Sequence, residues 1–189
     1  MADFKKLIPF IIYFETGIKD SSADNSSLFL KAKAKGVAND PADLGGDTLV
    51  GVTAATYKEY CRKVGRSTAR LQELSFQEWS DIFKGMFWDR WLADDIRSQK
   101  VAEMLVDWVW NSGAYGITIP QKFLGCKADG IVGPVTLAAV NDRNPDILFS
   151  QLRSERLAYI ERICNARPAN AKFRNGWIRR VNSVGNFQS

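Results

Sequence analysis

The chain of 189 residues contains no histidine and only three cysteines. Without histidine, the Ser-His-Asp and Cys-His nucleophile systems and the commonest zinc ligand sets are excluded. The cysteines, Cys61, Cys126 and Cys164, are odd in number and far apart, which suits neither a disulfide framework nor a clustered metal site. Acid–base chemistry therefore falls to carboxylates, Tyr, Lys or Cys.

Long hydrophobic runs are also missing. The longest one, Leu7 to Phe14, is interrupted by Pro9 and is far shorter than the roughly 20 residues that a membrane span needs. Glu15 follows this run at the place where a secretory signal would carry small residues. We therefore expect neither a transmembrane helix nor a secretory signal.

The composition, 46% hydrophobic and 25% charged residues, is that of a globular protein with one core, or one core and a small subdomain. The net charge of +5 is concentrated near the C-terminus, where residues 143–189 hold 9 Lys and Arg against 3 Asp and Glu. A basic segment of this kind is equally compatible with binding to nucleic acid and with binding to an anionic cell wall, so charge alone does not distinguish these partners.

Apolar residues recur at spacings of three and four along most of the chain, which predicts a mainly α-helical fold. Strand-like alternation is scarce. Ser75 followed by Glu78 predicts a capping box at the start of a helix. Asn144-Pro145 predicts the start of a long helix. The predicted helical segments are 4–14, 54–64, 76–88, 101–110, 134–140 and 147–164.

Between Gly17 and Gly51 the periodicity breaks down, apart from a short helix predicted near Leu28 to Lys35. The segment ends in Asn39-Asp-Pro-Ala-Asp-Leu-Gly-Gly-Asp-Thr48, which combines a restrictive Asp-Pro with two permissive glycines. Long loops in compact domains are often functional, so we expect this loop to carry part of a site.

Glu15 is the first candidate for catalysis because it ends an apolar helical segment. Large apolar neighbours desolvate a carboxyl group and favour its protonated form, which is the form that a general acid needs. Asp40, Asp43 and Asp47, with Thr48 and Thr53, could hold or activate a water molecule opposite it. The plainer alternatives are a solvent-facing glutamate at a helix end and aspartates that cap turns.

The turn at 129–134 and the aromatic residues of the middle segment are better explained by a structural role than by a functional one. Asp129-Gly-Ile-Val-Gly-Pro134 predicts a tight turn that leads into a helix. The aromatic residues of the middle segment are spaced as helix faces, so most belong to the core and a minority could stack on sugar rings. These residues are Trp79, Phe83, Phe87, Trp88, Trp91, Trp108 and Trp110.

Several of these motifs, in this order, resemble the N-acetylmuramidases of glycoside hydrolase family 108, also described as secretion-activator proteins. They are Glu15-Thr16-Gly17, the loop at 39–48, Gly51-Val52-Thr53, and Phe87-Trp88-Asp89 with Trp91. The second half resembles the peptidoglycan-binding domain that accompanies this family, in Val106-Asp107-Trp108, Asn111-Ser112-Gly113, Gln121 to Leu124 and the turn at 129–134.

The resemblance implies a lysozyme-like helical fold with a catalytic domain at 1–97 and a peptidoglycan-binding-like domain at 98–189. It implies hydrolysis of the bond between N-acetylmuramic acid and N-acetylglucosamine, with Glu15 as the catalytic acid. By analogy with lysozyme-like sites, Asp43 is the first choice for the second carboxylate, Asp40 is the second choice, and Thr48 or Thr53 orients the water. Asp40, Thr53, Trp88 and Asn111 are the predicted substrate-binding residues.

The implied partner is the peptidoglycan glycan strand, with no cofactor, no metal, no nucleic acid and no membrane insertion. Such a protein is made in the bacterial cytoplasm and acts at the cell wall or periplasm after export or lysis. Two departures from the family pattern stand out: Thr16 replaces a glycine, and about fifteen additional residues lie near Asp20 to Gly36. The rival hypotheses are a wall-binding protein without catalysis and a nucleic-acid-binding protein.

Overall fold

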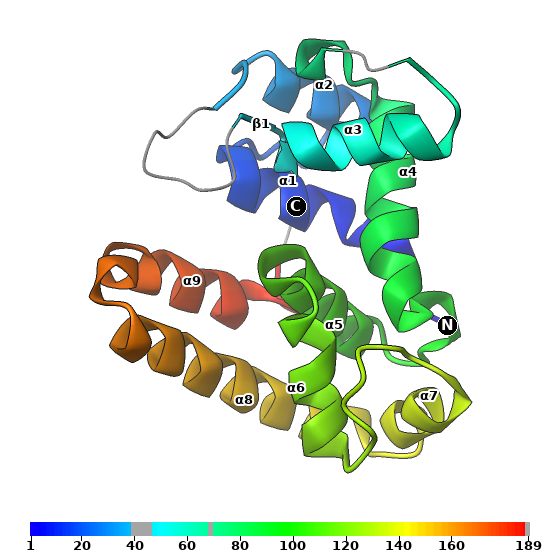
Figure 1. The fold of residues 1–189 in the computed structure, drawn as a ribbon, viewed down its shortest axis with the longest axis vertical. Coiled ribbons are helices and arrows are strands. Elements are labelled where there is room, and N and C mark those ends of the chain that lie inside the picture. The colour runs from blue at the N-terminus through cyan, green and yellow to red at the C-terminus, as the bar shows by residue number, and fades with distance from the viewer. Residues whose placement is uncertain (39–46, 68–69, 188–189) are drawn as a thin grey trace. The chain divides into compact units, whose positions relative to one another are not determined.

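The computed structural model describes residues 1–38, 47–67 and 70–187. Within these residues the chain forms nine α-helices, several shorter helical turns and one two-stranded hairpin, as Figure 1 shows. The predicted mainly α-helical class is therefore confirmed, and each predicted helical segment overlaps an observed helix. Asp40 and Asp43 lie outside the described residues.

The chain divides into two compact units. The N-terminal unit comprises residues 5–86, and the C-terminal unit comprises residues 1–4 and 87–187. The domain boundary expected after residue 97 stays a prediction. Each unit has its own core.

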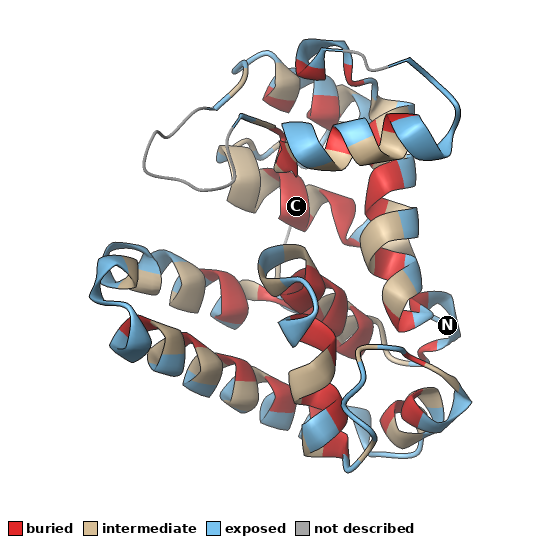
Figure 2. Ribbon diagram, viewed as in Figure 1, coloured by how far each residue is buried: buried red, intermediate tan, exposed pale blue. Residues whose placement is uncertain are grey.

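The N-terminal unit is built from four α-helices and the hairpin. Its core is formed where α1 packs on α2 and α2 packs on α4, and Phe29 and Trp79 meet there with ring centroids 5.9 Å apart. Figure 2 shows the buried residues as stripes on these helices. The elements are α1 (Ile8–Thr16), α2 (Asn25–Lys33), β1 (Thr48–Leu49), β2 (Val52–Thr53), α3 (Ala54–Lys63) and α4 (Phe76–Phe83), with 3-10 turns at Phe4–Lys6 and Leu71–Glu73.

The hairpin has an unusual turn. Leu49 pairs with Val52, so Val50 and Gly51 form a two-residue connection, and both have positive φ, 48° and 76°. A β-branched residue at positive φ is strained. The Trp79 indole N–H donates to the Val50 carbonyl at 2.9 Å, which ties this strained turn to the core.

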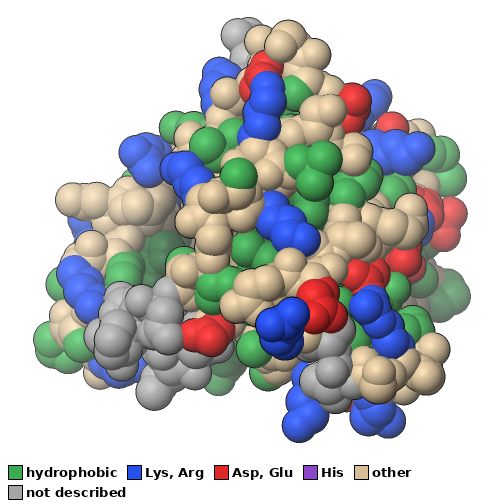
Figure 3. Space-filling view, turned by 90° about the horizontal axis from the view of Figure 1, so that it is seen from above, with side chains coloured by type: hydrophobic (Ala, Val, Ile, Leu, Met, Phe, Trp, Pro, Cys, Tyr) green, Lys and Arg blue, Asp and Glu red, His purple; other side chains and the backbone are tan. Residues whose placement is uncertain are grey.

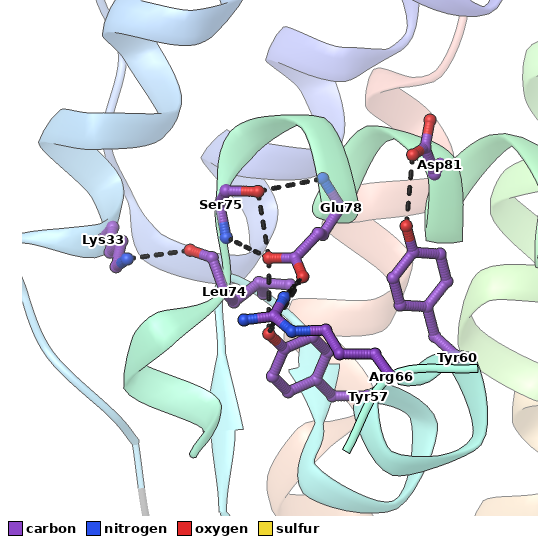
Figure 4. A network of polar contacts seen from close by, with 8 residues as sticks. All are labelled: Lys33, Tyr57, Tyr60, Arg66, Leu74, Ser75, Glu78 and Asp81. Atoms are coloured by element: carbon purple, nitrogen blue, oxygen red, sulfur yellow. Dashed lines mark hydrogen bonds and ion pairs between the residues drawn. The ribbon is translucent and has the colours of Figure 1, made fainter. Parts of the chain in front are cut away.

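A polar network joins α2, α3 and α4 at the start of α4, as shown in Figure 4. The predicted capping box is present: the Ser75 Oγ accepts from the Glu78 N–H, and the Ser75 N–H donates to Glu78 Oε2 at 2.9 Å. The other carboxyl oxygen, Oε1, accepts from the Tyr57 hydroxyl at 3.2 Å and pairs with Arg66. One glutamate therefore caps a helix and links it to α3.

The C-terminal unit is built around α5. This helix packs against α6 and α8, and α8 packs against α9. The α5–α6 contact requires a glycine, because a Cβ at Gly116 would lie 2.5 Å from the backbone of Trp108. The elements of this unit are 3-10 turns at Asp89–Trp91, Ala93–Asp95 and Pro168–Asn170, and α5 (Gln99–Ser112), α6 (Tyr115–Leu124), α7 (Pro134–Asn141), α8 (Pro145–Ala166) and α9 (Ala171–Ser183). A π-helical segment, Lys84–Trp88, contains the division between the two units.

The start signals predicted in this unit are also found. The Asn144 side chain accepts from the N–H groups of Asp146 and Ile147 at 3.0 and 3.2 Å and so caps α8. Pro134 opens α7, after a turn in which Gly130 has a φ of 77°. Helices α6 and α9 are additions that the predicted segments did not include.

Over the described ranges, no helix is long and apolar enough to cross a membrane. The same residues contain no group of three or more His, Cys, Asp and Glu side chains placed to hold a metal ion. Cys61, Cys126 and Cys164 are free thiols, of which Cys61 and Cys164 are buried.

Candidate active site around Glu15

Glu15 lies in the last turn of α1, where the local sequence ends the helix. Gly17 adopts a left-handed conformation with a φ of 71°, and its N–H donates to the Tyr13 carbonyl at 2.7 Å. Glycine accepts this conformation without strain, so it is the residue that terminates the helix. Glu15 is therefore held at the end of an element whose other face, Ile8, Ile11 and Ile12, is buried in the core.

Thr16, which replaces a glycine of the family pattern, fits the helix without a positive φ. Its hydroxyl donates to the Ile12 carbonyl at 2.7 Å and accepts from the Ile18 N–H at 3.2 Å. The Thr16 side chain therefore joins the end of the helix to the residues that follow it.

Glu15 lines a groove of about 180 Å³ in the N-terminal unit. The groove brings together the end of α1, the segment after α2 and the hairpin. Besides Glu15 and Thr16, its walls include Lys35, Val37, Ala38, Thr48, Val50 and Gly51. Of the predicted site residues that the structure describes, it thus unites Glu15 and Thr48.

The backbone of Thr48 is paired with the backbone of Ala38. Its N–H and C=O groups exchange hydrogen bonds of 2.9 and 2.8 Å with Ala38. Ala38 and Thr48 both line the groove, and Asp40 and Asp43 lie between them in the sequence.

Thr53 pairs with Thr48 across the hairpin, but its hydroxyl group is engaged at the start of α3. It caps α3 by accepting from the Thr56 N–H at 3.1 Å and lies 2.9 Å from the Thr56 hydroxyl. Thr53 is not among the described residues that line the groove. Thr48 is consequently the better placed of the two threonines.

Trp88 and Asn111, two predicted substrate-binding residues, belong to the C-terminal unit. Trp88 is fully buried, and its indole N–H donates to the Asp94 carboxylate at 2.8 Å. Its ring therefore lies in the core and not at a cleft rim. Asn111 is exposed at the end of α5 and donates to the Asp107 carbonyl at 2.8 Å.

Lys35 is the groove residue that the sequence reasoning missed. It follows α2, which occupies the additional segment near 20–36, and its Nζ donates to the Thr16 carbonyl at 2.6 Å. Nothing in the sequence distinguishes Lys35 from the neighbouring lysines of the predicted helical segment. Its approach to α1 depends on how α2 packs, and periodicity does not report that packing.

The positive charge of the chain is spread over the surface on the face seen in Figure 3, where Lys and Arg side chains alternate with hydrophobic and uncharged ones. Nearer the C-terminus, Arg156 and Arg180 are buried. The basic surplus of residues 143–189 is therefore partly internal, which weakens the nucleic-acid hypothesis.

Comparison with known proteins identifies both halves of the chain. Residues 31–113 match the family model described as Glycosyl hydrolase 108, and residues 115–182 match the model described as Predicted Peptidoglycan domain. A solved structure of SagA from Brucella abortus is 30% identical, covering 82% of this chain and 90% of that one, with a TM-score of 0.67. The chain belongs to the glycosyl hydrolase 108 family. No curated protein matches it.

Membership of the glycosyl hydrolase 108 family makes the protein a glycoside hydrolase, and the second domain makes it a peptidoglycan hydrolase. The three groove residues Glu15, Lys35 and Thr48 do not all lie within the matched stretches. Lys35 and Thr48 fall inside the residues matched to the hydrolase model, whereas Glu15 precedes them. The support for a role of Glu15 therefore comes from its position in the groove and from its sequence motif.

Proposed function

We propose that this protein is an N-acetylmuramidase that hydrolyses the bond between N-acetylmuramic acid and N-acetylglucosamine, with Glu15 as the general acid. The observation that carries the proposal is the position of Glu15. A carboxyl group at the end of a buried helix faces a groove whose opposite walls come from the hairpin and from the segment after α2.

In the proposed reaction Glu15 donates a proton to the glycosidic oxygen as the bond to the anomeric carbon breaks. Positive charge develops on the sugar ring in an oxocarbenium-like transition state. A water molecule then adds to the anomeric carbon and gives one of its protons to a base, which releases it to solvent, while the other proton stays on the new hydroxyl group. Glu15 regains a proton from solvent before the next turnover.

Asp43 is the first choice for that base, and Asp40 is the second. Both belong to the loop whose two ends, Ala38 and Thr48, are paired at the groove. The Thr48 side chain lies at the same wall and is the proposed residue that orients the water, since the Thr53 hydroxyl is occupied at the start of α3.

The test is release of reducing ends from purified peptidoglycan by the wild-type protein and by Glu15→Gln. We expect the variant to lose at least about a hundredfold in rate, the usual contribution of a general acid. Glu59→Gln is the matched control, because Glu59 is a partly exposed residue of α3 that pairs locally with Arg62 and does not line the groove. Circular dichroism checks that both variants are folded.

Mass spectrometry of the products decides which bond is cut. N-acetylmuramic acid at the new reducing end supports the proposal, whereas N-acetylglucosamine there refutes the bond assignment. Full activity of Glu15→Gln would refute the role of Glu15. Unchanged turnover of a folded Asp43→Asn variant would refute the role of Asp43 as the base and leave Asp40 as the candidate.

A further inference from the structure

A second pocket lies within the C-terminal unit, between the end of α5 and the facing sides of α8 and α9. Its volume is about 110 Å³, several times the space that one buried water molecule needs. Asn111 from α5, Arg156 and Tyr159 from α8, and Trp177 and Arg180 from α9 contribute to its lining. Nothing in the proposed cleavage uses these residues.

Beneath the pocket is a buried cluster of three charges. Asp107 is fully buried, and its Oδ1 accepts from Arg180 Nε and Nη2 at 3.0 and 2.8 Å. Arg156 Nη2 lies 2.8 Å from the other oxygen, Oδ2. The Arg156 and Arg180 side chains are only 4% and 7% exposed, and both residues contribute to the lining of the pocket.

The cluster makes the lining of the pocket cationic. The three charges sum to +1, and both arginines line the pocket while Asp107 does not. Burial acts to raise the pKa of Asp107, but the guanidinium groups of Arg180 and Arg156 outweigh it and lower that pKa, so the carboxylate stays charged. Guanidinium groups that are desolvated in this way bind carboxylates well, because their planar N–H groups match carboxylate geometry.

The other walls are apolar. Trp177 and Tyr159 supply aromatic surface, and Ile163 supplies aliphatic surface beside them. A small pocket with a cationic lining and apolar walls suits a terminal carboxylate next to a methyl or short aliphatic group. A neutral sugar ring is larger and needs hydrogen-bond partners around its whole edge.

We infer that this pocket binds the free terminal carboxylate of a peptidoglycan stem peptide, with Arg156 and Arg180 holding the carboxylate and Trp177 covering the adjoining alanine methyl group. The inference assumes the peptidoglycan substrate of the proposed function and adds a site for the peptide, separate from the cleavage of sugars. It assigns to the C-terminal unit the role of holding the wall through its peptides.

The experiment is calorimetric titration of the full chain with diacetylated L-Lys-D-Ala-D-Ala, which carries one carboxylate, and with its C-terminal carboxamide. We expect the acid to bind at least about tenfold more tightly, because the amide loses the charge-assisted hydrogen bonds. Trp177→Ala should weaken binding of the acid by about tenfold. Ile147→Ala, which removes an exposed apolar side chain of α8 outside the pocket, should leave it unchanged.

Equal affinity for acid and amide, absence of binding at millimolar peptide, or full affinity in Trp177→Ala would overturn the inference. The comparison of acid and amide uses the wild-type protein, so it decides the matter even if a variant does not fold. Reducing-end release measured on the same wild-type preparation separates the two proposals. Cleavage without peptide binding rejects only the pocket, and peptide binding without cleavage rejects only the muramidase.

Discussion

Lys35 donates a hydrogen bond of 2.6 Å from its Nζ to the carbonyl of Thr16, the residue that follows the proposed catalytic acid. The interaction places a cation at the C-terminal end of α1, where the helix dipole is negative. It also joins the additional segment near 20–36 to the Glu15 groove. The segment therefore contributes to the walls of the groove.

Replacing Lys35 by Met should reduce hydrolysis more than it reduces stability. The side chain is exposed, so we expect the free energy of unfolding to change by less than about 1 kcal/mol. The groove loses a cation and the support of the Thr16 carbonyl, and we expect kcat/KM to fall by about three- to tenfold. Reducing-end assays and urea denaturation measure the two effects.

Lys31→Met is the matched control for Lys35. Lys31 lies on α2, four residues before Lys35, but it pairs with Asp20 and does not line the groove. Its variant should keep wild-type kcat/KM. Equal losses in the two variants would show that a general change of charge, and not the contact with Thr16, is responsible.

Thr16→Gly, which restores the family pattern, should destabilise this protein. It removes the hydroxyl bonds to Ile12 and Ile18 and introduces glycine into a helix, at a combined cost of about 1–2 kcal/mol. A fall of several degrees in Tm, with activity retained, is the expected result in a thermal melt. An unchanged or higher Tm would mean that the two hydroxyl bonds contribute no net stability.

Asp107→Asn should be among the most destabilising single changes in the C-terminal unit. It leaves two buried guanidinium groups without their carboxylate, a loss of about 3–5 kcal/mol. Chemical denaturation at pH 7, followed by tryptophan fluorescence, gives the difference. A loss below about 1 kcal/mol would show that water or other groups solvate these arginines.

The same carboxylate predicts a pH dependence. The pKa of Asp107 is lower in the folded protein than the ordinary value of 3.8, so folding favours the charged form. Its contribution to stability is complete at neutral pH and is lost as pH falls below that value toward the folded pKa. Denaturation midpoints of the wild type and Asp107→Asn should therefore converge on acidification, and parallel curves from pH 7 to pH 3 would be inconsistent with this coupling.

Ser75→Ala tests the network at the start of α4. The hydroxyl accepts from the Glu78 N–H at 3.2 Å, and loss of such a cap costs about 1 kcal/mol. Ser80→Ala, inside the same helix, should be neutral or slightly stabilising because alanine is the better helix former. Equal unfolding free energies for the two variants would rule out a capping contribution.

Local signals determined much of the fold from the sequence alone. Glycine at position 17 ends α1 immediately after Glu15 and Thr16, and Ser75 and Asn144 begin α4 and α8, because each of these effects involves neighbours within a few residues. Of the two unpredicted helices, α6 contains Pro120, which is typical of a helix break. In α9 the apolar residues Phe173, Trp177 and Val181 recur at a spacing of four, a helical signal that the predicted segments omitted.

Tertiary structure decided which of these residues meet. The sequence determined that Glu15 ends an apolar helix, and the motifs determined the family. Only packing placed Lys35 and Thr48 beside Glu15, enclosed Trp88 in the core and put Arg156 and Arg180 around Asp107. Helix ends depend on local backbone conformation, whereas burial and pairing of side chains depend on residues distant in sequence, which no local pattern specifies.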